Sequence, residues 1–216
     1  MKINYDLKFK EELALLKDTK PTLLLHVCCG PCSGNVIKEI ADKFNITIYY
    51  SNSNIYPRDE YLRRYQELLS FINQFNHDYD QHIEVIEQDY QPELYLKDLS
   101  LYKDEPEGGK RCYLCYKKRM NDAYQYAKDH HFAYWTTVLS VSPHKNSQWI
   151  NEIGGSYPQE HTKFLFSDFK KNNGYLKSVQ FADSYHLYRQ NYCGCIYSYQ
   201  EMLQRKKERE NNVASL

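Results

Sequence analysis

The chain has 216 residues, a length that fits one or at most two domains with a substantial buried core. Its 28 basic and 28 acidic side chains cancel, so a surface for a polyanion must be a local patch. The N-terminal residues lack the apolar core of a signal peptide, and no apolar segment reaches membrane-spanning length. We therefore expect a cytoplasmic protein with no membrane partner, in which cysteine thiols stay reduced.

The first half of the chain alternates between strand and helix patterns. Amphipathic spacing predicts a short helix over 8–17, which leads into an apolar strand at 22–28. The later elements expected in this half are a helix at 31–44, a strand at 46–50, a helix from Pro57 to about Asn76 and a strand at 83–86. This rhythm predicts an α/β fold with a Rossmann-like parallel sheet and flanking helices.

The second half is less regular but supplies one more strand and several helices. Its expected elements are helices at 89–100, 112–130, 146–153, 175–188 and 196–208, a strand at 132–139, and loops at 104–110 and 140–145. The segment 162–173 fits no single assignment. No linker or repeat divides the chain, so we expect residues 1–216 to form a single α/β domain. In the doubly wound order the strands at 22–28 and 132–139 are neighbours, and a crevice opens between their carboxyl ends.

Three thiols follow the first strand directly. Cys28, Cys29 and Cys32 stand among glycine and proline residues, which permit a tight turn and suit the first turn of a helix. In parallel sheets ligands bind at the carboxyl ends of the strands, and a helix N-terminus lowers thiol pKa values. The sequence therefore predicts a metal site or redox site at this edge of the sheet.

The other four cysteines form two pairs, one of them in the helical C-terminal portion. Cys112 and Cys115 lie one helical turn apart, and Cys193 and Cys195 flank Gly194 in a turn. Seven cysteines in a reduced compartment indicate metal binding or redox chemistry. Four thiolates hold an iron–sulfur cluster, which leaves three for redox work or a second metal. A tetrahedral zinc site with three buried cysteines is the competing interpretation.

The pair Cys193 and Cys195 admits two chemical interpretations. A disulfide across one intervening residue is strained and easily reduced, so a dithiol of this kind suits the delivery of two electrons. Two close thiolates equally suit an iron ion or the corner of a cluster. The spacing alone does not decide between them.

Together these motifs resemble the cobalamin-independent epoxyqueuosine reductases, the QueH family, over about residues 22–198. The resemblance is carried by LHVCCGPC at 25–32, NIYP at 54–57 with Glu60, Tyr61 and Arg64, EPEGGKRCYLC at 105–115, TTVLSVSPHK at 136–145, DFKK at 168–171 and YRQNYCGC at 188–195. Several separated motifs in the same order make it far more specific than a single CxxC.

The resemblance implies the last step of queuosine biosynthesis, in which epoxyqueuosine at the wobble position of a tRNA anticodon is reduced to queuosine. It also implies a [4Fe–4S] cluster, for which Cys28, Cys29, Cys112 and Cys115 match the family's positions. An external donor would supply the electrons. The chain has no GxGxxG motif, so we expect neither flavin nor nicotinamide, and the family resembled works without cobalamin.

The resemblance also bears on the three remaining thiols. Cys193 and Cys195 match a pair that is either redox-active or binds an additional mononuclear iron. The family can carry Asp at the position of Cys32, and both residue types ligate iron, so Cys32 is a candidate ligand of that second iron. We therefore expect these three residues to take part in catalysis.

Four cationic or titratable side chains are candidates for substrate binding. His144 and Lys145 lie in a loop expected to face the crevice, while Arg189 precedes the Cys193 turn. Arg111 and Lys145 could bind phosphate, and the fixed charge of Arg189 could hold substrate or lower a thiol pKa. The modified nucleotide would be splayed out of the RNA into the pocket.

Two other functions compete with the reductase. A sulfur-inserting tRNA modifier of the adenylating type needs a Gly-rich pyrophosphate loop after the first strand, where this chain has Cys-Cys-Gly-Pro-Cys. A zinc-stabilised nucleic-acid-binding module would use some of the same cysteines without redox chemistry. The metal content of the protein distinguishes these alternatives.

Overall fold

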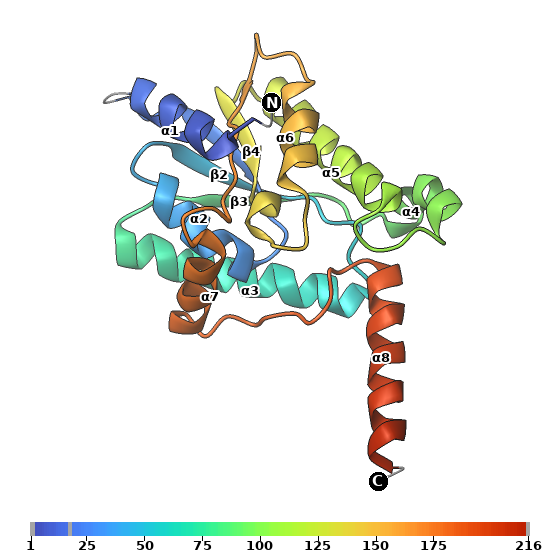
Figure 1. The fold of residues 1–216 in the computed structure, drawn as a ribbon. Helices are drawn as coiled ribbons and strands as arrows, with labels where there is room; N and C mark the ends of the chain where they lie inside the picture. The colour runs from blue at the N-terminus through green and yellow to red at the C-terminus, as the bar shows by residue number, and fades with distance from the viewer. Residues whose placement is uncertain (1–2, 17–18, 215–216) are drawn as a thin grey trace.

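A five-stranded parallel sheet forms the centre of the protein (Figure 1). The structure, a computed structural model, describes residues 3–16 and 19–214, with side chains up to residue 211. The strands are β1 (Thr22–His26), β2 (Asn45–Tyr50), β3 (Glu84–Glu87), β4 (Tyr134–Thr137) and β5 (Lys163–Phe164). They lie in the order β3-β2-β1-β4-β5, with every neighbouring pair parallel. The predicted Rossmann-like α/β fold is confirmed.

Helices flank this sheet and join its strands (Figure 1). They are α1 (Tyr5–Leu15), α2 (Gly30–Ile40), α3 (Arg58–Tyr79), α4 (Pro92–Leu99), α5 (Lys110–Asp129), α6 (Ser147–Gly155), α7 (Gly174–Ser184) and α8 (Ile196–Ala214). Helix α2 packs against α7 and α3, whereas α5 packs against β1, β4 and α6. Short 3-10 helices follow α4 at Ser100–Tyr102 and β4 at Val138–Val141.

Strand β1 lies at the centre of the sheet and is buried on both faces. Leu23, Leu24 and Leu25 are fully buried, which explains why this strand is continuously apolar rather than alternating. β1 pairs with β2 on one side and with β4 on the other, as the doubly wound order predicts. The strand order reverses at β1, so the carboxyl ends of β1 and β4 open onto the crevice where such folds bind ligands.

Several element boundaries differ from the predicted ones for local reasons. Helix α1 begins at Tyr5 because the Asn4 side chain accepts a hydrogen bond from the backbone of Leu7. Residue 17 of the predicted first helix lies outside the described residues. β4 ends at Thr137, whose hydroxyl accepts a hydrogen bond from Leu139 N at 3.2 Å and starts the 3-10 turn.

The ambiguous segment 162–173 contains the short edge strand β5, followed by irregular chain. A strand of two residues is too short to produce a periodic sequence pattern, so the sequence of this segment does not predict its secondary structure. No helix in the described part of the chain is long and apolar enough to cross a membrane.

The contact between α2 and α7 makes a direct stability prediction. A Cβ atom at Gly34 would lie 2.4 Å from Phe181 Cδ1, whereas one at Gly30 would meet only Leu187 at an ordinary 3.5 Å. Alanine gains about 1 kcal/mol of helix propensity over glycine, but overpacking a core costs about 1–3 kcal/mol. We expect Gly34→Ala to lower the free energy of unfolding in urea titrations. Gly30→Ala on the same helix is the matched control, and equal effects of the two would contradict this packing.

Candidate metal centre and active site

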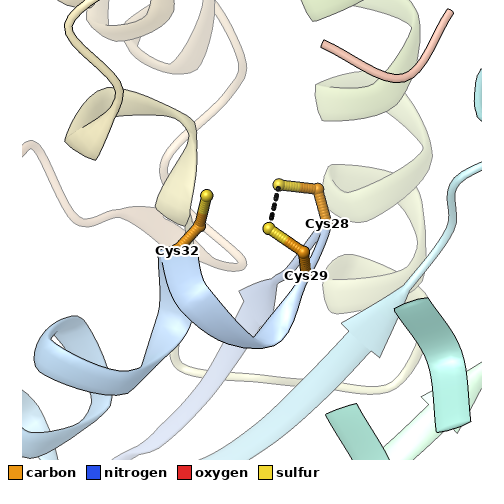
Figure 2. A group of neighbouring side chains, drawn as sticks. All are labelled: Cys28, Cys29 and Cys32. Atoms are coloured by element: carbon orange, nitrogen blue, oxygen red, sulfur yellow. Dashed lines mark hydrogen bonds between the residues drawn. The ribbon is translucent and has the colours of Figure 1, made fainter. Parts of the chain in front are cut away.

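Cys28, Cys29 and Cys32 bring their sulfur atoms together where β1 passes into α2 (Figure 2). The three Sγ atoms all lie within 4.8 Å of one another, with 3.8 Å between those of Cys28 and Cys29. Hydrogen bonding with Cys29, and then with Cys32, lowers the pKa of Cys28 well below its ordinary value. The same interaction with Cys28 raises the pKa of Cys29 to about 11. One thiol of the group therefore ionises readily, and the thiolate is the form that binds metal.

The first turns of α5 supply a second pair of thiols, Cys112 and Cys115. The backbone N–H of Gly108 donates to Cys112 Sγ at 3.3 Å, and the Tyr95 hydroxyl donates to Cys115 Sγ at 3.0 Å. Burial raises the pKa of both thiols, that of Cys115 to about 11. Hydrogen-bond donors directed at sulfur stabilise thiolates and adjust the reduction potential of the metals that those thiolates hold.

The turn Cys193–Gly194–Cys195 supplies the third pair, and two backbone contacts fix it in place. Tyr56 N donates to Gly194 O at 2.7 Å, and Arg64 Nη1 donates to Cys193 O at 3.4 Å. Gly194 has φ +122°, a conformation that only glycine adopts without strain. The turn is therefore tied to the residues that precede and begin α3.

Arg119 of α5 carries a buried positive charge among the thiols. Its Nη2 donates to Asn52 Oδ1 at 2.7 Å, and the Asn52 side chain donates to Val27 O at 2.8 Å, which links α5 to the end of β1. Burial by itself would lower the pKa of Arg119, but the nearby sulfur charges of Cys115 and Cys28 raise it. This cation therefore lies close to two of the three cysteine groups.

Lys145 is a second cation at the site, on the loop after the 3-10 turn. Burial would lower its pKa, but the negative charges of Cys193, Cys28 and Cys32 outweigh burial and raise it. The ammonium group thus lies near both the β1 thiols and the C-terminal turn. Lys170 Nζ donates to the Lys145 carbonyl oxygen at 2.7 Å and holds this loop in position.

Arg64 of α3 is the third cation of the site, and it is buried. Its Nε donates to Glu60 Oε1 at 2.7 Å, and its side chain is 1% exposed. Burial acts to lower its pKa, whereas the negative charge of Cys29 and the hydrogen bond to Glu60 raise it. The guanidinium therefore joins the C-terminal turn, which it contacts through Cys193 O, to the β1 thiols.

Within the described part of the chain, two buried nitrogen atoms of these cations have no hydrogen-bond partner: Arg64 Nη2 and Arg119 Nε. Glu60 pairs with Arg64 Nε, but these two nitrogen atoms remain without a partner, and burial of such a group is costly unless negative charge lies beside it. Metal-bound thiolates are anionic and would provide that charge. Seven free cysteines around three cations therefore fit an anionic metal–thiolate group. Which thiol binds which metal stays a prediction.

A cavity of about 350 Å³ adjoins the thiols at the carboxyl ends of β1 and β4. His144, Lys145 and Arg189, three of the predicted substrate-binding residues, line it. The thiols that also line it are Cys28, Cys32, Cys112 and Cys193. The structure thus brings together residues that are more than 150 positions apart in the sequence. Their roles toward a substrate stay predictions.

Arg111, the fourth predicted substrate-binding residue, is not among the side chains that line this cavity. It is buried, and its guanidinium donates to the carbonyl oxygens of Tyr102, Lys103 and Glu105. It also lies over the Tyr197 ring at 4.3 Å. Arg111 therefore holds the loop before α5 against the start of α8, and its proposed contact with phosphate stays a prediction.

Gln190 is a site residue that the sequence alone does not indicate. Its Nε2 donates to Cys29 Sγ at 3.3 Å, and its Oε1 is buried without a partner. Arg119 is a second such residue. Nothing in the local pattern of either residue indicates burial beside sulfur, because the contact joins segments distant in sequence.

Thiols from three separated segments, buried cations and an adjoining cavity are typical of a thiol-based metal or redox centre, and the group of Cys28, Cys29 and Cys32 on this α/β sheet could bind a metal ion. The family described as epoxyqueuosine reductase QueH matches residues 23–201. Similar proteins include the QueH epoxyqueuosine reductases of Streptococcus pyogenes (41% identical, covering 91% of this chain and 78% of the relative) and Thermotoga maritima (33%, 87% and 95%). The QueH epoxyqueuosine reductase of Staphylococcus aureus is 37% identical, and the matched region covers 91% of this chain and 84% of the relative. The chain belongs to the QueH family, a family of oxidoreductase enzymes.

The geometry of the C-terminal turn generates a prediction about Gly194. A Cβ atom there would lie 2.9 Å from Arg64 Nη1 at a φ that side chains rarely adopt. Gly108 has φ +84°, but a Cβ atom there would meet nothing within 4 Å. Both substitutions place alanine at a positive φ, but only Gly194→Ala also brings a Cβ atom against Arg64. Gly194→Ala should therefore lower the free energy of unfolding by about 1–2 kcal/mol more than Gly108→Ala does. Denaturant titration of both variants measures this, and equal losses would show that Arg64 does not constrain the turn.

Proposed function

We propose that this protein reduces epoxyqueuosine to queuosine at the wobble position of tRNA. The observation that carries the proposal is the convergence of three cysteine groups beside one cavity, with Arg119 and Lys145 lining that cavity and the buried Arg64 in contact with the C-terminal turn. Membership of the QueH family supports the choice of substrate. The reaction consumes two electrons and two protons, and the epoxide oxygen leaves as water while an alkene forms. The electrons come from an external donor.

Cys28, Cys29, Cys112 and Cys115 would hold a [4Fe–4S] cluster, and Cys32, Cys193 and Cys195 would hold a second iron or act as a redox pair. When bound, such groups supply single electrons and a Lewis acid. This assignment is supported by the number of thiols, by the hydrogen-bond donors directed at sulfur and by the unpaired buried nitrogen atoms of Arg64 and Arg119.

The chain's own residues orient the substrate and supply fixed charge. Arg189 and His144 at the cavity would hold the nucleotide, because they are exposed and line the same opening. Lys145 stays protonated beside the thiols, so its ammonium places positive charge where negative charge develops on a departing oxygen. The half-buried walls of the cavity reduce access of water to the reacting atoms.

The most direct test of this function is an anaerobic assay. The purified protein is incubated with epoxyqueuosine-containing tRNA and a strong reductant, and nucleosides are measured by mass spectrometry. We expect epoxyqueuosine to disappear and queuosine to appear in equal amount. A metal-replete protein that leaves epoxyqueuosine unchanged would contradict the proposal.

The C-terminal thiol pair makes a second prediction. Replacing both Cys193 and Cys195 by Ser should lower turnover by a factor of about 100 or more, because it removes either the redox pair or ligands of the second iron. Iron and sulfide are measured on the same preparation as the control. Retained cluster iron with lost turnover would support the assignment, whereas normal turnover would refute it.

A further inference from the structure

The outer part of α8 projects from the body of the protein (Figure 1). The base of the helix is anchored: Tyr197 lies against Arg111, and the Tyr199 ring lies 5.5 Å from that of Tyr56. From Leu203 to residue 211 every described side chain is exposed. We call residues 203–211 the α8 arm.

The α8 arm is held by contacts within the helix rather than by a core. Arg205 pairs with Glu201 at 3.5 Å and Lys206 with Glu210 at 3.9 Å, each one turn apart. Such exposed pairs contribute only a few tenths of a kcal/mol each, and short isolated helices are marginal in water. The largely polar surface of the arm is therefore open to solvent and to ligands from outside the chain.

One face of α8 continues directly from the thiol site. The hydroxyl and backbone N–H of Ser198 contact Cys195 Sγ at 3.4 and 3.5 Å, so this side of the helix faces the C-terminal turn. Arg205, seven residues later, lines the cavity. Arg209 follows after four more residues. Spacings of seven and four place these side chains on one helix face, with about 6 Å of rise between the two arginines.

Positive charge prevails around the same cavity. Arg189 and Arg205 line its exposed rim, against the carboxylate of Glu107, whereas Arg119 and Lys145 lie deeper beside the thiols. The net charge of the whole chain is zero, so this is a local concentration. It favours an anionic ligand larger than the cavity, because Arg205 and Arg189 lie at its exposed rim.

We propose that this face of the α8 arm, Arg205 and Arg209, binds the phosphate backbone of the RNA that carries the substrate nucleotide. The inference rests on the proposed function and specifies how the RNA lies. A nucleotide within a strand can enter the cavity only if the phosphates on either side of it stay at the rim. Arg189 and Arg205 are placed for those phosphates, and Arg209 for phosphates further along the strand.

The QueH family match ends at residue 201, before the α8 arm begins. The arm is thus additional to the part of the chain that defines the family. An RNA ligand fits it better than an acidic protein, because its charged face runs without a break into the substrate cavity. A protein that docked there would cover the entrance that the RNA uses.

The test compares Arg209→Gln with Lys207→Gln, a matched control. Both remove one exposed charge from the arm, but Lys207 lies about 160° around the helix from Arg209. Gln has nearly the same helix propensity as Arg and Lys, so helix stability changes little in either variant. Affinity for epoxyqueuosine-containing tRNA is measured by fluorescence anisotropy over a series of salt concentrations, with turnover measured on the same samples.

We expect Arg209→Gln to weaken binding about threefold or more and to lessen the slope of log K against log salt by about 1, with little change for Lys207→Gln. If the wild type reduces tRNA but the two variants change binding equally, or not at all, the proposed role of the α8 arm in RNA binding is overturned. A wild type that neither binds nor reduces tRNA would instead overturn the proposed function. If Arg209→Gln slows only turnover driven by a protein electron donor and leaves tRNA affinity intact, the face docks a protein, which also overturns the RNA assignment.

Discussion

Three cations beside seven thiols, two of the cations buried and one half-buried, are the constraint on which the rest of this structure depends. Arg64, Arg119 and Lys145 come from α3, α5 and the loop after β4. Arg119 and Lys145 lie near sulfur atoms from more than one segment, and Arg64 lies near those of Cys28 and Cys29. Two of their nitrogen atoms are buried without partners. Glu60 compensates part of the charge of Arg64, and the positive charge that remains favours thiolates at this edge of the sheet and fits a metal–thiolate group.

The fold explains why the centre forms where it does. β1 is buried on both faces between β2 and β4, and the strand order reverses at its carboxyl end. The chain must leave the sheet there, which places Cys28, Cys29 and Cys32 in the turn into α2. In nucleotide-binding relatives of this architecture the same position holds phosphate. Here the thiols occupy it, α5 and the C-terminal turn close over it, and the α8 arm extends its positive rim outward.

Much of this could be predicted from the sequence, because the informative patterns are local. The apolar run of β1, the strand–helix alternation and the three cysteine groups gave the sheet, the pairing of β1 with β4 and the edge that carries the thiols. The roles of Arg119, Gln190 and Asn52 could not be predicted, since their contacts join distant segments and leave no local pattern. Arg111 illustrates the converse: a charge beside a cysteine motif suggests a surface contact, whereas tertiary packing buries it against three carbonyl groups.

We propose that the thiols and cations together hold an anionic iron–sulfur group. Elemental analysis of anaerobically purified protein, with acid-labile sulfide and the visible absorption spectrum measured on the same sample, tests it most directly. We predict a brown protein with iron and sulfide in comparable amounts and little zinc. A colourless protein that contains zinc without iron or sulfide would contradict the account.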